Sequence, residues 1–408
     1  MKLLLALAAA GVFCLGLRPA EPVWTVVIGG DSDGHLAPCG CTFPMTGGIR
    51  RRSTVVRDHA PTEHRLVLDT GSFVTSVGPQ DRFKAEMLAE AAGTMGAVVA
   101  LTPSEAQFGP GQFAALRALA GDAYVSGNVK GVEGLENVAE RGPFAITALA
   151  TDPEGISGPL AGIPVSREEA IKGLLSKAMV PIVMYAADED QARDLARSSP
   201  KLSLIVHRRG GAPAKEILYE EGVALVSPGE RGKYVVMLDR RGAKWENYRA
   251  IDLGPEIKDD KLISRMYAAY LQRVEGAGLL DMVPRSEAGA FVGNEACLSC
   301  HPKAAAVWKG SKHAHAYESL ESEGHDRDPD CVRCHVTGLE AKGGFMSRSA
   351  TPQFAFVGCE SCHGAGGQHV SSPKIPYNRS GPETCARCHT GDNSPRFDYK
   401  TYWKKIAH

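Results

Sequence analysis

Short apolar runs alternate with amphipathic segments between residues 23 and about 250. Several of the apolar runs are rich in β-branched residues and lack strict alternation, which is typical of strands covered on both faces. The predicted strands are Val23–Gly29, Leu66–Thr70, Ala97–Thr102, Ala123–Ser126, Phe144–Ala150, Met179–Ala186, Leu202–His207, Val223–Ser227 and Tyr234–Leu238. The predicted helices are Asp81–Ala92, Gln112–Ala120, Arg167–Ala178 and Glu189–Arg197. Strands and helices that take turns along the chain favour a layered α/β domain.

The pattern changes after about residue 254. Ile257–Val274 carries apolar residues at helical spacing, and a looser stretch follows it. From residue 294 the chain is rich in Cys, His, Gly and Pro, with almost no strand-like sequence. We therefore predict an α/β domain over residues 21–254, a connecting helix and linker over 255–293, and a mainly α domain over 294–408.

The N-terminus differs from both domains, since Lys2 precedes an apolar run from Leu3 to Leu17. That run is shorter than the ~20 residues of a bilayer-spanning helix and suits the core of a secretory signal peptide. We expect residues 1–20 to be a signal peptide and the protein to be exported, to the periplasm or the cell surface. Lipidation at Cys14 is left open, although bulky Phe13 precedes it, so membrane association through the N-terminus stays a hypothesis.

Composition and charge limit the function further. A length of 408 residues is too great for one ordinary core, and 43% hydrophobic with 23% charged residues is typical of globular protein. The formal net charge of -1 gives no sign of a strongly basic surface. We therefore expect no nucleic acid partner.

Eight of the eleven cysteines fall in four copies of a Cys-x-x-Cys-His pattern. The copies are Cys297-Leu-Ser-Cys300-His301, Cys331-Val-Arg-Cys334-His335, Cys359-Glu-Ser-Cys362-His363 and Cys385-Ala-Arg-Cys388-His389. This is the attachment signature of c-type haem, in which two thiols bind one porphyrin and the adjacent histidine is the proximal iron ligand. Zinc sites also use paired cysteines, but neither zinc nor disulfides explain a histidine after every second cysteine. The sequence predicts four covalently bound haem c groups.

The segment from Cys297 to His408 is short for four porphyrins, so a conventional apolar core could hardly form there. We expect short helices and loops packed around haem. The candidate distal ligands outside the motifs are His313, His315, His325, His369 and His408, with Met346 as the only methionine of the segment. Because methionine ligation raises the potential, its scarcity indicates mostly bis-histidine haems of low potential.

Residues 293 to 408 resemble the cytochrome c-554 family of tetrahaem electron-transfer proteins. The resemblance is carried by Trp308-Lys-Gly-Ser-Lys-His313-Ala, Cys331-Val-Arg-Cys-His-Val-Thr-Gly338, Cys359-Glu-Ser-Cys-His-Gly-Ala-Gly-Gly-Gln-His369, and the ending Ile406-Ala-His408. It implies that His313, His369 and His408 are distal ligands, with His369 serving the first haem. One haem of that family can lack a distal ligand, so an open iron is expected as an alternative, and His315 is the residue that could close it.

Residues 24 to 240 resemble the metallophosphoesterase domain of exported 5′-nucleotidases. Matching stretches are Val27-Ile-Gly-Gly-Asp31-Ser-Asp33, Leu68-Asp69-Thr-Gly-Ser72, Thr102-Pro-Ser-Glu105 and Leu204-Ile-Val-His207-Arg-Arg209. Several metal-ligand positions of the family are changed: Asp33 replaces a histidine and Ser72 replaces the bridging aspartate. A two-metal hydrolase needs clustered carboxylates and imidazoles. Asp31, Asp33, Asp69, Glu105 and His207 form at most a vestigial metal site, so we expect this domain to be inactive.

Cys39 and Cys41 follow the first of these stretches and could form a disulfide, bind a soft metal or contact a partner. For the whole chain we expect an exported electron carrier that exchanges electrons with redox donor and acceptor proteins. Two alternatives stay open. One is an oxidoreductase acting on a small nitrogen or sulfur species at an open haem, and the other is a nucleotidase-like hydrolase with an electron-transfer appendage.

Overall fold

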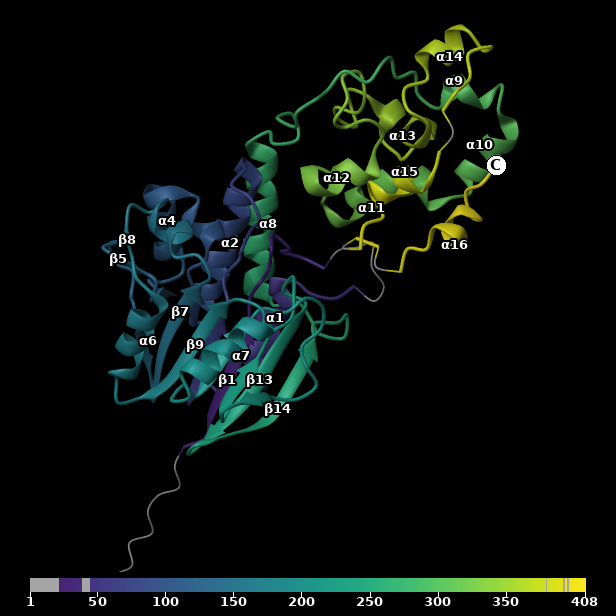
Figure 1. Cartoon of the computed structure of the whole chain (residues 1–408). Coiled ribbons are helices and arrows are strands. Elements are labelled where there is room, and N and C mark those ends of the chain that lie inside the picture. Colours follow the sequence, from purple (N-terminus) through teal and green to yellow (C-terminus); the bar gives the residue numbers. More distant parts are fainter. Residues whose placement is uncertain (1–21, 39–44, 379, 392, 395) are drawn as a thin grey trace, which may run out of the picture.

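The computed structural model describes residues 22–38, 45–378, 380–391, 393–394 and 396–408. Its N-terminal part, here called the layered domain (residues 22–254), contains two six-stranded sheets (Figure 1). In the first sheet the strand order is β14 (Lys244–Asp252), β13 (Tyr234–Arg241), β1 (Trp24–Gly29), β2 (Arg65–Asp69), β3 (Ala97–Ala100) and β4 (Tyr124–Val125). Strands β1 to β4 are parallel, whereas β13 is antiparallel to both of its neighbours.

The second sheet is also mixed. Its order is β11 (Leu218–Glu220), β12 (Val223–Val226), β10 (Leu204–His207), β9 (Val180–Ala186), β7 (Phe144–Ala150) and β6 (Ala139–Arg141). The four inner strands are parallel and the two edge strands antiparallel. A separate two-stranded ladder pairs β5 (Val129–Lys130) with β8 (Ile163–Pro164).

The buried side chains show that the two sheets pack face to face with helices outside. Val26 and Ile28 of β1 lie in one cluster with Ile182 and Met184 of β9, so this cluster fills the space between the sheets. The outer face of the first sheet is covered by α1 (Ile49–His59), α2 (Pro79–Thr94), α4 (Gly109–Leu119) and α8 (Lys261–Gly276). The outer face of the second is covered by α6 (Arg167–Leu175) and α7 (Glu189–Ser198). Because both faces of each inner strand are buried, their sequences are continuously apolar, and the predicted layered α/β fold is confirmed.

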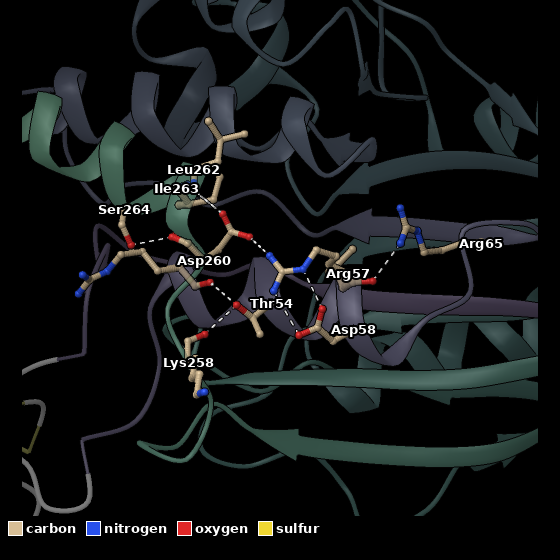
Figure 2. Close-up of polar contacts among 11 residues, drawn as sticks. Thr54, Arg57, Asp58, Arg65, Lys258, Asp260, Leu262, Ile263 and Ser264 are labelled. Carbon is tan, nitrogen blue, oxygen red and sulfur yellow. Dashed lines mark hydrogen bonds and ion pairs between the residues drawn. The ribbon is translucent and has the colours of Figure 1, made fainter.

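Helix α8 leads from the layered domain toward the second part of the chain (Figure 1). Asp260 caps its N-terminus by accepting hydrogen bonds from the backbone N–H groups of Leu262 and Ile263 at 2.8 and 3.1 Å. The same carboxylate pairs with Arg57 of α1, and the Thr54 hydroxyl of α1 donates to the Lys258 carbonyl at 2.7 Å (Figure 2). Tyr267, Tyr270 and Val274 are buried in the core of the layered domain. The predicted connecting helix is thus fixed to that domain along its length.

The cysteine-rich module (residues 294–408) consists of short helices. They are α9 (Glu295–Leu298), α10 (Pro302–Lys309), η1 (Lys312–His315), α11 (Ala316–Glu323), α12 (Pro329–His335), η2 (Pro352–Phe354), α13 (Cys359–His363), α14 (Gly367–Ser371), α15 (Pro382–Ala386) and α16 (Tyr399–Trp403). One small apolar cluster includes Tyr317, Val332 and Phe345. Helices α9, α10, α14, α15 and α16 bury no residue completely. Among the described residues, no helix combines the length and apolar character needed to cross a membrane.

Candidate haem centre

Each of the four Cys-x-x-Cys-His motifs lies on or beside a short helix. The second and third motifs lie in α12 and α13, whereas the first begins in α9 and the fourth in α15. Residues three apart on a helix lie on the same face, so the two thiols of the second motif, and likewise those of the third, point to a common side. None of these eight cysteines is in a disulfide, and none is fully buried. The cysteines are therefore available in pairs for two thioether bonds to one porphyrin.

Three of the four motif histidines face a second histidine. The ring centres of His301 and His369 are 6.2 Å apart. His389 and His313 are also 6.2 Å apart, and His363 and His408 are 5.9 Å apart. When two imidazoles bind one metal from opposite sides, each metal–nitrogen bond is about 2 Å long and each ring centre lies beyond its nitrogen. The two ring centres are then about 6 Å apart. The three pairs therefore fit two imidazoles on opposite sides of one iron, and each joins a motif histidine to one of the three distal ligands that the resemblance implies.

Hydrogen bonds at Nδ1 orient several of these rings. His363, His369 and His408 place Nδ1 at 2.6, 2.8 and 2.9 Å from the carbonyls of Asn378, Ile375 and Ile406, respectively. A carbonyl can only accept, so Nδ1 carries the proton and Nε2 is left with its lone pair. Metal-bound histidines usually have this arrangement, in which a backbone oxygen fixes the tautomer and the ring plane. These histidines are thus oriented to bind iron through Nε2.

Burial favours the neutral form of one facing pair. It lowers the pKa of His389 and also that of His313, where the neighbouring His389 and His335 lower the pKa further. Iron binds the neutral imidazole, so a low pKa reduces competition by protons.

The second motif differs because His335 has no facing histidine among the ring contacts of the described residues. Its Nδ1 lies 2.6 Å from the Ala316 carbonyl, so Nε2 is again left for a metal. His315, the residue expected to close an open iron, is largely exposed and lies 2.9 Å from Glu318. His325, another distal candidate, contacts the Tyr267 hydroxyl at 3.3 Å. Neither has a ring contact with His335 among the described residues.

One residue of this region was missed by the sequence analysis. Glu360, between the two cysteines of the third motif, is 3% exposed. Its carboxylate accepts hydrogen bonds from the N–H groups of Val292, Gly293 and Gly366 at 2.8 to 3.2 Å. The Asn294 side chain accepts from Cys359 N–H at 2.9 Å. Glu360 and Asn294 therefore tie the first motif to the third. The available sequence signal was an acidic residue between the two cysteines of a haem motif.

The carboxylates of the vestigial metal site lie close together at the carboxyl ends of β1 and β2. Asp31 Oδ1 is 3.2 Å from Arg208 Nε, and Asp69 Oδ2 is 3.0 Å from a terminal nitrogen of Arg52. Burial raises the pKa of Asp31 to about 7, and nearby Arg208 opposes that rise. Asp33 accepts from the hydroxyl of Ser72 at 2.7 Å. Arginine side chains thus supply the positive charge that these carboxylates would otherwise obtain from metal ions.

The remaining two candidates of that site are also engaged internally. Glu105 accepts from the N–H groups of Phe73 and Thr102 at 2.5 and 3.2 Å, and it forms the capping box of α3 (Pro103–Ala106). His207 is buried, with Nδ1 2.9 Å from the Arg208 carbonyl. No group of three or more His, Cys, Asp or Glu side chains within the described ranges is arranged to hold a metal ion. Cys39 and Cys41 lie outside the described residues.

The cysteine-rich module is similar to known multihaem cytochromes, which confirms the predicted resemblance. Residues 296–364 match the family described as "Cytochrome c554 and c-prime". Cytochrome c-554 from Nitrosomonas europaea is 38% identical over 113 residues, covering 23% of this chain and 48% of that protein. The C-type polyheme cytochrome OmcB from Geobacter sulfurreducens is 34% identical over 86 residues, covering 20% of this chain and 12% of OmcB. This chain therefore spans less than half the length of these relatives.

The layered domain shares its fold with 5′-nucleotidases. The 5′-nucleotidase precursor from Thermus thermophilus has a TM-score of 0.52 at 20% identity, covering 69% of this chain and 68% of that one. The NAD nucleotidase NadN from Haemophilus influenzae has a TM-score of 0.50 at 12% identity, covering 67% of this chain and 63% of that one. At such identities the likeness concerns the fold alone, and the predicted metallophosphoesterase-like fold is confirmed.

Proposed function

We propose that this protein is an exported tetrahaem c-type cytochrome that carries electrons between redox donor and acceptor proteins. The observation that carries the proposal is the set of three histidine pairs with ring centres 5.9 to 6.2 Å apart. Bound haem c supplies one-electron transfer at iron, and imidazole on both sides favours a low potential. The chain contributes thioether anchors at the four motifs, iron ligands at the paired rings, and Nδ1 hydrogen bonds that hold those rings in place.

Four haems also account for the packing of the cysteine-rich module. Its short helices bury few apolar side chains, so porphyrin faces would supply the missing apolar contacts. We expect the module to be largely unfolded when haem attachment fails. Attachment of c-type haem outside the cytoplasm is consistent with the predicted signal peptide at residues 1–20.

A second candidate function rests on His335. Because no histidine faces it among the described residues, the iron bound there would have one open axial position. An open position allows a small molecule to bind iron, which an oxidoreductase acting on a nitrogen or sulfur species requires. Turnover of such a species, with loss of activity in His335→Ala but not in His315→Ala, would favour this function over simple electron transfer.

The main proposal is tested by the mass of the purified protein and by the spin state of its haem iron. Mass spectrometry of the purified protein should show four haem additions, and a haem-free protein that contains zinc would contradict the proposal. Electron paramagnetic resonance should show mainly low-spin iron, with a high-spin signal of about one haem. His369→Ala should add a second high-spin signal because the His301 iron loses its facing imidazole. His315→Ala is the matched control, since His315 is largely exposed, pairs with Glu318 and should leave the spectrum unchanged.

A further inference from the structure

The layered domain contacts the cysteine-rich module through the residues that precede the second motif. Asp328 caps α12 by accepting from the N–H of Asp330 at 3.0 Å, and it is 5% exposed. One side chain of the layered domain and one of the connecting helix α8 also reach this carboxylate. Gln80 of α2 donates to Asp328 Oδ1 at 2.6 Å, and the Tyr270 hydroxyl of α8 lies 3.4 Å from Oδ2. Gln80 additionally donates to the Tyr270 hydroxyl at 3.0 Å, so the three side chains form one network.

A charge pair lies beside this network. Lys84 of α2 forms an ion pair with Asp330 of α12, and the lysine side chain is only 11% exposed. Burial acts to lower the pKa of Lys84, but the carboxylates of Asp330 and Asp328 outweigh burial, so the pKa is raised. A charged lysine this far from water persists only where a partner compensates it. Lys84 therefore holds a fixed positive charge against the start of α12.

A third contact involves the segment just before α12. His325 lies 3.3 Å from the Tyr267 hydroxyl of α8, with the two rings edge-on at 5.7 Å. Arg50 of α1 also lies over the Tyr267 ring, 4.9 Å from the ring centre. Since α8 is held to α1 at its N-terminus (Figure 2), these contacts join residues 325–330 to both helices.

Helix α12 carries the second haem motif, whose histidine has no facing histidine among the described residues. Helix α12 spans only Pro329–His335, and it includes both cysteines and the histidine of the second motif. An N-cap fixed on α2 and α8 therefore fixes the thiols of Cys331 and Cys334 relative to the layered domain. The charges of Lys84 and Asp330 also lie next to this attachment site. Fixed charges near a redox centre change its potential, because a positive charge favours the reduced form and a negative charge the oxidised form.

We propose that the layered domain positions the haem of the second motif and sets its potential, with Lys84, Gln80 and Tyr270 as positioning residues. This inference rests on the proposed function, because it requires haem at Cys331 and Cys334. It assigns to the layered domain a role in the redox chemistry of the one motif whose histidine has no facing histidine among the described residues. The other three motifs do not take part in this network.

The test is a potentiometric titration of the whole haem-loaded protein, followed by electron paramagnetic resonance. Lys84→Met should decrease the equilibrium constant for reduction of the high-spin haem by about tenfold, the order of magnitude for loss of one nearby charge at an effective dielectric constant of about 20. Tenfold corresponds to about 59 mV for one electron. Asp330→Asn should shift the same potential upward. The double variant Lys84→Met, Asp330→Asn should return close to the wild-type value, a compensation that loss of structure would not produce.

Arg82→Met is the matched control, because Arg82 lies on α2 but is exposed and pairs with Glu86. It removes the same charge from the same helix and should leave all potentials unchanged. A second arm, Gln80→Met with Tyr270→Phe, keeps the charges and loosens the cap; it should broaden the high-spin signal without altering the low-spin signals. The inference would be overturned if Lys84→Met and Arg82→Met shifted the potential of the high-spin haem equally, or if neither shifted it. In either case four attached haems would leave the proposed function intact. Missing haem at Cys331 and Cys334 would instead contradict the proposed function.

Discussion

Breaking the Arg52–Asp69 pair should strongly destabilise the layered domain. Arg52 of α1 and Asp69 at the end of β2 are 3.0 Å apart, with side chains 4% and 3% exposed. Among the described residues the guanidinium finds no hydrogen-bond partner, so its contribution is mainly charge compensation. Arg52→Met keeps much of the side-chain volume but leaves the Asp69 carboxylate buried without its cation. Removing one partner of a buried pair costs about 3–5 kcal/mol.

The pair can also be removed without leaving a charge behind. Asp69 Oδ1 accepts from Gly71 N–H at 3.0 Å, so Asp69→Asn keeps an acceptor for that group. In the double variant Arg52→Met, Asp69→Asn, neither charge of this pair stays in the core. Replacing a whole buried pair by neutral groups is often close to neutral. We therefore expect the double variant to recover most of the stability that Arg52→Met loses.

Urea unfolding followed by hydrogen exchange in peptides from β1 and β7 measures the layered domain separately from the cysteine-rich module. With a slope of about 3 kcal/mol per M, a loss of about 3–5 kcal/mol lowers the urea midpoint by about 1–1.7 M. Arg197→Met is the control, since Arg197 is 54% exposed in its ion pairs. Exposed pairs contribute about 0–1 kcal/mol. If Arg52→Met shifts the midpoint no more than Arg197→Met, the pair does not substitute for a cation and the reasoning fails.

Three further outcomes are expected. The full-length protein with added manganese, zinc or calcium should not hydrolyse nucleotides or model phosphodiesters. A chelator should not lower its thermal unfolding midpoint. Metal-dependent turnover that is lost on changing Asp31 or His207 would contradict the expected inactivity. Because the pKa of Asp31 is raised from 3.8 to about 7, its contribution to stability is present below pH ~4 and is lost as the pH rises through about 7. Asp31→Asn should therefore flatten the fall of the urea midpoint between about pH 4 and 7, measured against wild type. His408→Ala should convert one low-spin haem to high-spin in electron paramagnetic resonance, whereas the spectrum of His315→Ala should match wild type.

Predictions from apolar periodicity succeeded where strands are buried on both faces. β7 begins and ends at the predicted residues, and β1, β2, β10 and β12 lie within a residue or two of their predicted bounds. Two long elements were not predicted. β14 is an edge strand in which most residues are exposed or half-buried, so its sequence has no apolar run to detect. α1 begins with Ile49 and three arginines, so its first turn lacks the apolar spacing of a buried helix. Arg52 is nevertheless buried, because it faces the buried carboxylate of Asp69.

The residues of the candidate sites were also predicted only in part. The haem attachment residues follow from a local five-residue pattern, because thioether and iron chemistry fix that spacing. The distal histidines do not follow from spacing, since His301 and His369 are brought together only by folding. Their assignment came from the resemblance to cytochrome c-554 proteins. The ion pairs of Asp31 and Asp69 could not be predicted, because Arg208 and Arg52 approach from elements distant in the sequence.

The changed metal site and the support of the second motif share one loop. Gly34 follows Asp33 and has a φ of +82°, and a β-carbon there would lie 3.4 Å from Lys84 Nζ. The loop after β1 thus shapes the space in which Lys84 reaches Asp330. A catalytic loop that holds a metal must keep its ligands directed inward, whereas this loop is stabilised by Arg208 and the hydroxyl of Ser72. Loss of the metal ligands is therefore compatible with retention of the fold, and the loop after β1 lies beside Lys84 of α2, which pairs with the helix of the second haem motif.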